Sequence, residues 1–283
     1  MYDWVYIYEL EGNIKPQIHY LADKDYIGFW KEANYSFLFF KKDKKALFQR
    51  LSLPYRSELV IRHEDWESGQ SLDLLNVGKI TIHPPWKIPS VKEGIHICID
   101  PSMAFGYGYH ATTKGCLALI DQLFREFIPT KVLDLGTGTG ILSIACLKMG
   151  AQKAYCIDYN NLSTATAQKN IRLNGLERNL HLWMGDARDF LYLEADLLIA
   201  NMHYQIIDQI TSQEAFYSKK YYILSGLIGH EGYLIEEKLK KRLHLLNRHE
   251  ENFWFSYLFS NPALNLNRQK VEGGDPSCAL KTK

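Results

Sequence analysis

The stretch that most constrains the fold is residues 131–140, which read K-V-L-D-L-G-T-G-T-G. It begins with a short apolar run, as expected of a strand that is buried on both faces of a parallel sheet. Gly136, Gly138 and Gly140 follow at once, and residues 141–149 have the apolar spacing of a helix. A strand, a glycine turn and a helix form a nucleotide-binding crossover, because the glycines let a ligand lie against bare backbone.

The glycine spacing and two acidic residues narrow the class of ligand. The pattern is G-x-G-x-G rather than the G-x-G-x-x-G of dinucleotide enzymes, and Asp134 stands where dehydrogenases usually keep an apolar residue. Asp158 lies 22 positions after Gly136, where the second strand should end, and its carboxylate could accept both hydroxyls of a ribose. These features favour S-adenosylmethionine (SAM). A glycine-rich turn in an ordinary α/β sheet and a nicotinamide oxidoreductase are the alternatives, the second disfavoured by the spacing.

Length, charge and cysteine usage limit the classes of protein to which this chain can belong. A chain of 283 residues suggests one large or two modest domains, and a formal net charge of +1 gives no electrostatic argument for a nucleic-acid or membrane partner. No apolar run approaches the ~18 residues that a membrane span needs, and the first residues lack the pattern of a signal peptide. The five cysteines form no C-x-x-C pair and the histidines no H-x-x-x-H set, so we expect a reducing, cytoplasmic setting and no metal site.

The chain divides by composition into four parts. Residues 1–63 predict a small α+β domain rich in aromatic residues, whose rings either fill a small core, which we favour, or form a partner-binding face. Within this part we expect a helix over residues 41–51. Residues 64–78 are polar and are interpreted as a linker, and residues 79–260 hold the larger α/β domain. Residues 261–283 are polar, and we expect this tail to be disordered.

Strands are predicted over residues 79–83 and 95–99. From residue 131 onward seven more are predicted, with helical segments between the first five. The last two strands follow each other without room for a crossover helix, so they should form an antiparallel hairpin. A Rossmann-like sheet of seven strands with a terminal hairpin is the layout expected of a SAM-dependent methyltransferase. The predicted strands are residues 131–135, 154–158, 180–184, 196–200, 221–224, 244–248 and 253–259.

The segment upstream of the glycine turn is unusual in composition. Residues 100–113 read D-P-S-M-A-F-G-Y-G-Y-H-A-T-T and lead into a predicted helix over residues 116–124. Thr112 or Thr113 is expected to cap that helix. A simple turn would not need a phenylalanine and two tyrosines together, so we interpret the segment as a lid over a flat aromatic ligand.

These pieces together resemble the PrmA-type ribosomal-protein lysine methyltransferases, which methylate amines of large-subunit ribosomal protein eleven. The resemblance implies a SAM-dependent protein N-methyltransferase whose partner is a ribosomal protein, with no direct nucleic-acid or membrane binding and with a monomeric state. Its motifs run in the family's order: E-D-W at 64–66, I-H-P-P-W at 82–86, the segment at 100–113, V-L-D-L-G-T-G-T-G-I-L-S-I-A at 132–145, N-G-L at 174–176, A-N-M at 200–202 and L-S-G-L-I at 224–228.

The resemblance also implies roles for individual residues in binding the cofactor. Thr113 looks like the threonine before the helix that contacts SAM. Asp134, Gly136 and Gly138 belong to the glycine turn, and Asp158 would hold the ribose.

Two further residues lie after predicted strands. Asn201, at the end of the fourth strand of the α/β part, would sit beside the methionine moiety of SAM and the entering substrate, which makes it the catalytic candidate. Asp186, in G-D-A after the third strand, could accept a hydrogen bond from the adenine amino group or could cap a helix.

The chain departs from the family pattern F-G-T-G-T-H-P-T-T, because Tyr107, Tyr109 and Ala111 replace two threonines and a proline. If the two tyrosine rings blocked the substrate entrance, a non-catalytic SAM-binding or ribosome-associated protein would be favoured. The N-M-H-Y motif at residues 201–204 lacks the paired prolines of N-P-P-Y, which argues against methylation of planar amide or base nitrogens.

Overall fold

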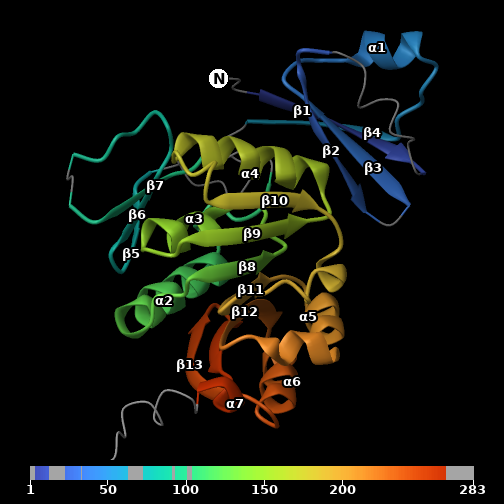
Figure 1. Cartoon of the computed structure of the whole chain (residues 1–283). Helices are drawn as coiled ribbons and strands as arrows, with labels where there is room; N and C mark the ends of the chain where they lie inside the picture. The colour runs from blue at the N-terminus through green and yellow to red at the C-terminus, as the bar shows by residue number, and fades with distance from the viewer. Residues whose placement is uncertain are drawn as a thin grey trace, which may run out of the picture.

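The computed structural model describes residues 4–12, 23–32, 34–62, 73–90, 93–100 and 104–265. Its largest sheet has the strand order β10-β9-β8-β11-β12-β14-β13 (Figure 1). The first five of these strands run parallel, and β14 lies antiparallel to both β12 and β13. This confirms the predicted seven-stranded sheet and its terminal hairpin. The strands are β8 (Lys131–Leu135), β9 (Lys153–Asp158), β10 (Leu180–Met184), β11 (Leu197–Asn201), β12 (Tyr221–Ile228), β13 (His244–Glu251) and β14 (Trp254–Ser260).

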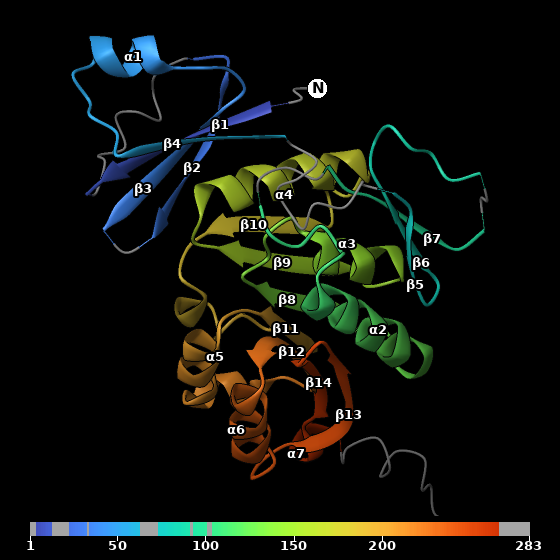
Figure 2. The ribbon, with the colours of Figure 1, turned by 180° about the vertical axis from the view of Figure 1, so that it is seen from behind.

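Helices cover both faces of this sheet, because successive strand residues point to opposite sides. Val132 packs in a cluster with residues of α2, α3 and α4, whereas its neighbour Leu133 packs with residues of α5 and α6. Figures 1 and 2 show the resulting layers from two sides. The helical elements of this part are α2 (Ala111–Glu126), α3 (Ile141–Lys148), α4 (Asn161–Leu173), η3 (Ala187–Asp189), α5 (Tyr204–Thr211), η4 (Glu214–Ser218), α6 (His230–Leu239) and α7 (Pro262–Asn265).

A second, three-stranded sheet precedes α2, in the order β5-β6-β7. Its strands are β5 (Leu75–Val77), β6 (Ile80–His83) and β7 (Ile95–Cys98). β5 falls within the segment interpreted as a linker, whereas residues 64–72 of that segment, with the E-D-W motif, lie outside the described residues. The predicted disordered tail also lies outside them from residue 266 onward, and its first residues form α7.

The N-terminal part is a four-stranded antiparallel sheet in the order β2-β3-β1-β4, with one short helix. Its elements are β1 (Trp4–Glu11), β2 (Tyr26–Glu32), β3 (Tyr35–Phe40), α1 (Lys45–Arg50) and β4 (Ser57–Arg62). One face forms a core of aromatic rings in which Tyr8 contacts Phe48 at 4.5 Å and Tyr55 at 5.1 Å between ring centroids. Many of the N-terminal rings therefore fill a small core, as favoured from the sequence.

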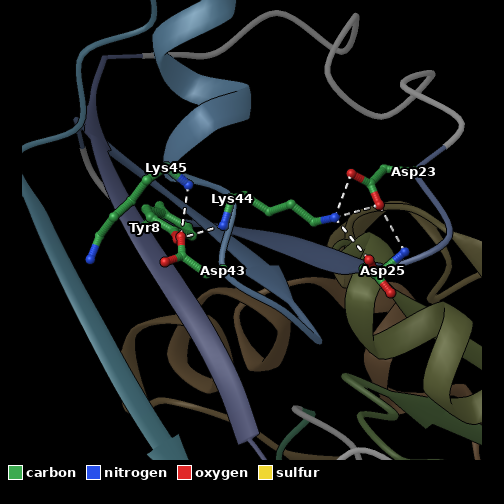
Figure 3. Close-up of polar contacts among 6 residues, drawn as sticks. All are labelled: Tyr8, Asp23, Asp25, Asp43, Lys44 and Lys45. Atoms are coloured by element: carbon green, nitrogen blue, oxygen red, sulfur yellow. Dashed lines mark hydrogen bonds and ion pairs between the residues drawn. The ribbon is translucent and has the colours of Figure 1, made fainter.

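Polar contacts explain why α1 begins at Lys45 rather than at residue 41 (Figure 3). The Asp43 carboxylate accepts hydrogen bonds from the Lys45 N–H and the Tyr8 hydroxyl, both at 2.8 Å. The Lys44 ammonium reaches back to Asp23 and Asp25, at 2.8 and 2.9 Å. These contacts tie the start of α1 to the sheet and to the turn before β2.

The opposite face of the N-terminal sheet packs on the larger domain. Val5, Ile7 and Phe39 form a buried cluster with Leu162, which lies in the first turn of α4. The packing is close at β2, since a Cβ added to Gly28 would lie 2.6 Å from Cδ1 of Leu162. The N-terminal sheet therefore covers the beginning of the helix that follows Asp158 (Figures 1 and 2).

Candidate active site

The candidate site lies at the carboxyl ends of the parallel strands. The strand order reverses direction between β8 and β11, because the chain moves from β8 to β9 and β10 on one side and from β11 to β12 on the other. In open α/β sheets, the crevice at such a switch point is where ligands bind. The glycine turn follows β8, Asp158 ends β9 and Asn201 ends β11, so the fold brings these predicted residues to one edge of the sheet.

The glycine turn is held against the end of β9. The backbone N–H groups of Gly136 and Thr137 both donate to the carbonyl oxygen of Ile157, at 2.8 and 3.0 Å. The N–H of Gly138 donates to Oδ2 of Asp158 at 2.9 Å. The turn and the predicted ribose acid are therefore joined by a direct hydrogen bond between residues 20 positions apart.

The Asp158 carboxylate is buried but well supplied with donors. Its Oδ1 accepts from the Asn160 N–H at 2.9 Å. Burial raises the pKa of Asp158, while hydrogen bonds from Asn160, Gly138 and Ser163 act in the opposite direction. Because a carboxylate offers about four lone-pair positions, it can accept ribose hydroxyls in addition to its backbone partners.

Two other predicted cofactor residues carry buried polar atoms that have no hydrogen-bond partner among the described residues. Asp134 accepts through Oδ2 from the hydroxyls of Thr137 and Ser143, at 2.7 and 2.8 Å, but its Oδ1 has no partner. Burial raises the pKa of Asp134 to about 6. The hydroxyl oxygen of Thr113 is likewise buried without a partner. Unmet hydrogen-bonding groups of this kind fit a polar ligand beside the glycine turn.

The segment before α2 crosses directly over the glycine turn. The Thr139 N–H donates to the Phe105 carbonyl oxygen at 3.1 Å, and the Thr139 hydroxyl donates to the Gly106 carbonyl oxygen at 2.5 Å. Gly138 has a φ of +55°, and a Cβ there would collide with the Phe105 oxygen. Only glycine therefore fits beneath this crossing.

The structure corrects the interpretation of this segment as an aromatic lid. Tyr107 is buried in the core that contains β6, and its ring stacks on that of Tyr109 with 5.6 Å between centroids. The Tyr109 hydroxyl accepts from the Asp73 N–H and donates to the Asp73 carbonyl oxygen, both at 2.9 Å. The two tyrosines thus anchor the segment to residues before β5, because their rings find a core there. Phe105 is the aromatic residue of the segment that remains exposed.

The structure also corrects the predicted cap of α2. Thr112 and Thr113 lie in the first turn of the helix, and the N-cap residue is His110, whose extended backbone precedes it. The ring Nδ1 of His110 accepts from the Thr112 N–H at 3.3 Å and from the Thr112 hydroxyl at 2.8 Å. A neutral ring with its proton on Nε2 supplies the Nδ1 lone pair that this cap uses. Burial lowers the pKa of His110, while the charge of Glu251 acts in the opposite direction.

Asn201 is joined to this cap. Its Nδ2 donates to the Thr112 hydroxyl oxygen at 3.2 Å. This bond uses one of the two Nδ2 hydrogens and leaves Oδ1 as an acceptor for a ligand. The hydrogen bonds thus run from the end of β11 through Thr112 to His110, and they fix the orientation of the predicted catalytic amide.

Asp186 forms hydrogen bonds within the protein. Its Oδ1 accepts from the Arg188 N–H at 2.9 Å and so caps η3, which is the helix-cap alternative. Its carboxylate also pairs with the Arg188 guanidinium, and the hydrogen bonds from Arg188 lower the pKa of Asp186. A contact with the adenine amino group stays a prediction.

Sequence reasoning assigned no role to Met202 or Gly226. A Cβ added to Gly136 would lie 2.5 Å from Cγ of Met202, so this flexible side chain rests on the bare backbone of the turn. Gly226 lies at an irregularity in the pairing of β12 with β14, where a Cβ would collide with the Met202 carbonyl oxygen. The predicted strand ended at residue 224, whereas β12 runs on to Ile228 and includes Gly226. A glycine within a strand marks a bulge or a close backbone approach, so this signal became visible only with the observed strand.

Within the described ranges, no helix is long and apolar enough to cross a membrane. The same residues contain no group of three or more histidine, cysteine, aspartate or glutamate side chains that could hold a metal ion.

Comparisons with known proteins agree with this geometry. Residues 12–261 match the model of the family described as ribosomal protein L11 methyltransferase (PrmA). A ribosomal protein L11 methyltransferase of Caldanaerobacter subterraneus is 33% identical over 204 residues, which cover 70% of this chain and 65% of that protein. One from Thermoanaerobacter sp. (strain X514) is 34% identical over 200 residues, covering 69% of this chain and 64% of that protein. The chain thus spans slightly less than two thirds of the length of these relatives.

A solved structure shows the same fold. The crystal structure of a ribosomal protein L11 methylase from Lactobacillus delbrueckii subsp. bulgaricus aligns with a TM-score of 0.60 and 26% sequence identity. The alignment covers 67% of this chain and 98% of that one.

Proposed function

We propose that this chain, which belongs to the ribosomal protein L11 methyltransferase (PrmA) family, transfers methyl groups from SAM to lysine or N-terminal amines of ribosomal protein L11. The main support for the proposal is that three predicted features lie together at the switch point of the sheet. The glycine turn, Asp158 and Asn201 lie together there, beneath the segment that crosses the turn. We also propose that the partner is a protein rather than a nucleic acid, that the enzyme acts in the cytoplasm and that it is a monomer.

The residues of the glycine turn fit SAM in polarity. Asp158 would accept the ribose hydroxyls, while the Thr113 hydroxyl and the free oxygen of Asp134 would meet the polar atoms of the methionine moiety. When bound, SAM supplies a methyl group that is already activated as part of a sulfonium. The protein must then exclude water and hold the acceptor in line, and such positioning can lower the activation barrier by about 7 kcal/mol.

An amine substrate must be neutral before it can act as a nucleophile. A lysine amine has a reference pKa of about 10.4, so it is protonated near neutral pH. Partial burial at the carboxyl edge and a nearby positive charge lower that pKa. The Oδ1 atom of Asn201 can accept a hydrogen bond from the neutral amine, while the bond from Nδ2 to Thr112 fixes the orientation of the amide. Asn201 would thereby aim the nitrogen lone pair without acting as a base.

The non-catalytic alternative is weakened by the placement of the two tyrosines. A SAM-binding protein without activity would be expected if Tyr107 and Tyr109 blocked the substrate entrance. Both rings instead have partners within the protein: Tyr107 is buried in the core, and the Tyr109 hydroxyl binds Asp73.

The proposal is tested by incubating the purified chain with radiolabelled SAM and unmethylated ribosomal protein L11. We expect label on L11 and a mass increase in multiples of one methyl group, and we expect Asn201→Ala to slow the transfer while still binding SAM. SAM binding by calorimetry without any transfer would support the non-catalytic alternative. Absence of SAM binding would revive the nicotinamide oxidoreductase.

A further inference from the structure

The tip of the β13–β14 hairpin has a strained backbone. Glu251 pairs with Trp254, so Asn252 and Phe253 alone form the connecting turn. Their φ angles are +53° and +64°, as a type I′ turn requires. Asparagine tolerates this left-handed region, but a bulky residue such as phenylalanine is an outlier there, and glycine is the usual second residue.

Neither the turn nor the core explains a phenylalanine at this position. The Phe253 side chain is 74% exposed, so it contributes little to the buried core. A strained residue persists when its surroundings hold it in place, and such residues gather at functional sites. The feature that distinguishes Phe253 from the expected glycine is an aromatic ring presented to the outside of the molecule.

The hairpin tip lies beside the candidate active site. The Phe253 carbonyl oxygen accepts from the Gly229 N–H at 2.9 Å, directly after the carboxyl end of β12. The ring of Trp254 lies 5.0 Å from that of His110, between centroids, and His110 binds the Thr112 that holds Asn201. The exposed ring of Phe105 also lies near His110, at 5.1 Å between ring centroids. The hairpin tip is therefore linked to the site through Trp254 and His110, and from His110 through Thr112 to Asn201.

The surroundings of the tip are mainly acidic. Glu250 and Glu251 end β13, and Glu231 accepts a hydrogen bond from the Ile228 N–H at the end of β12. Lys114 lies 3.2 Å from Glu251, and the Nε2 atom of His249 lies 3.8 Å from the same carboxylate. An exposed aromatic ring within an acidic rim complements a polypeptide segment that carries both lysines and apolar side chains.

We propose that Phe253 is a specificity-determining contact for the protein substrate and packs on an apolar side chain near the amine that is methylated. The inference rests on the proposed function, because its occupant is the amine-bearing segment of ribosomal protein L11. The acidic residues at the tip attract that segment, and the ring sets its register beside Asn201. Phe253 touches neither the cofactor turn nor the reacting atoms.

The substitution Phe253→Gly separates this role from a structural one. It removes the ring and leaves the residue that a type I′ turn prefers, so the Tm should not fall below that of the wild type. We expect KM for L11 to rise about fivefold or more, as for loss of a well-packed aromatic contact, with kcat and the Kd for SAM unchanged. Asn252→Gly is the matched control: it alters the same turn, keeps the ring and should leave KM unchanged.

Equilibrium binding of L11 to each variant is measured alongside methyl transfer. The two measurements distinguish a failure of the Phe253 contact from a failure of the proposed methyltransferase function. Normal transfer with an unchanged KM and an unchanged Kd for L11 in Phe253→Gly would overturn the role of Phe253 and leave the proposed function standing. L11 binding that weakens in Phe253→Gly without any methyl transfer by the wild type would overturn the proposed function and support the contact. If the wild type does not bind L11, this contact is refuted whatever the transfer assay shows.

Discussion

At the residue scale, Asp158 combines two tasks in one carboxylate. It accepts the Gly138 N–H and so shapes the glycine turn, and it also ends the strand where a ribose would lie. Buried carboxylates are costly unless they are hydrogen-bonded, and the N–H groups of Gly138 and Asn160 offset that cost. A change at this one position should therefore disturb both the shape of the cofactor site and its direct contact with the ligand.

We expect Asp158→Ala to weaken SAM binding at least about tenfold, because it removes hydrogen bonds to a charged group, each worth about 1.5–3 kcal/mol. Isothermal titration calorimetry with SAM measures the effect. Asp158→Asn keeps one acceptor oxygen and should give an intermediate affinity. A Kd for Asp158→Ala within about twofold of the wild type would show that Asp158 does not hold the ribose.

At the scale of the element, the start of α2 depends on a titratable cap. The neutral His110 ring accepts from the first turn of the helix, and the same turn carries Thr112 and Thr113 into the site. Because burial lowers the pKa of His110, the unfolded chain binds its proton more readily than the folded one. The contribution of this group to stability is therefore complete above the unfolded pKa of about 6.5 and is lost as the pH falls below it.

The variant His110→Asn should flatten this pH dependence, since asparagine is a good N-cap that does not titrate. Between pH 7.5 and pH 5, the wild type should lose more of its free energy of unfolding than the variant does. The loss of a cap costs about 0.5–2 kcal/mol, which sets the size of the difference. Urea unfolding at the two pH values measures it, and parallel losses in both proteins would mean that His110 does not carry the effect.

At the scale of the whole molecule, the N-terminal sheet is docked on the larger domain through α4. Val5, Ile7 and Phe39 of the sheet bury Leu162, which follows the Asp158–Asn160 turn by two residues. The aromatic core on the opposite face of the sheet is closed by α1 and does not involve α4. The sheet can thus keep its own core while its position depends on the contact with Leu162.

We expect Leu162→Ala to loosen this contact, with a cost of about 2–5 kcal/mol as for other large-to-small changes in a core. Hydrogen exchange should become faster in α4 and in β1 and β3, while β8 and β11 keep their protection. Leu173→Ala is a matched control, because Leu173 ends the same helix and is 41% exposed. Equal exchange in wild type and Leu162→Ala would mean that the contact does not hold the sheet in place.

Local patterns in the sequence determined the sheet, the hairpin, the glycine turn and the acid at the end of β9. The central strands β8, β11 and β12 are visible in short windows because strands buried on both faces are mostly apolar. The partners of individual side chains could not be predicted in this way. His110 rather than a threonine caps α2, Tyr109 binds Asp73, and Leu162 receives the N-terminal sheet.

Each of these outcomes depends on which surfaces meet. Tyr107 and Tyr109 were read from composition as part of a lid, but burial of their rings beside β6 and the residues before β5 is available only once the small sheet is formed. The strain at Phe253 is equally hidden in the sequence, because it arises only when the hairpin register leaves two residues for the turn. The sequence by itself determined which residue types the site contains. The tertiary structure decided which side chains surround the site, because packing between distant segments selects among side-chain positions that local propensity leaves equal.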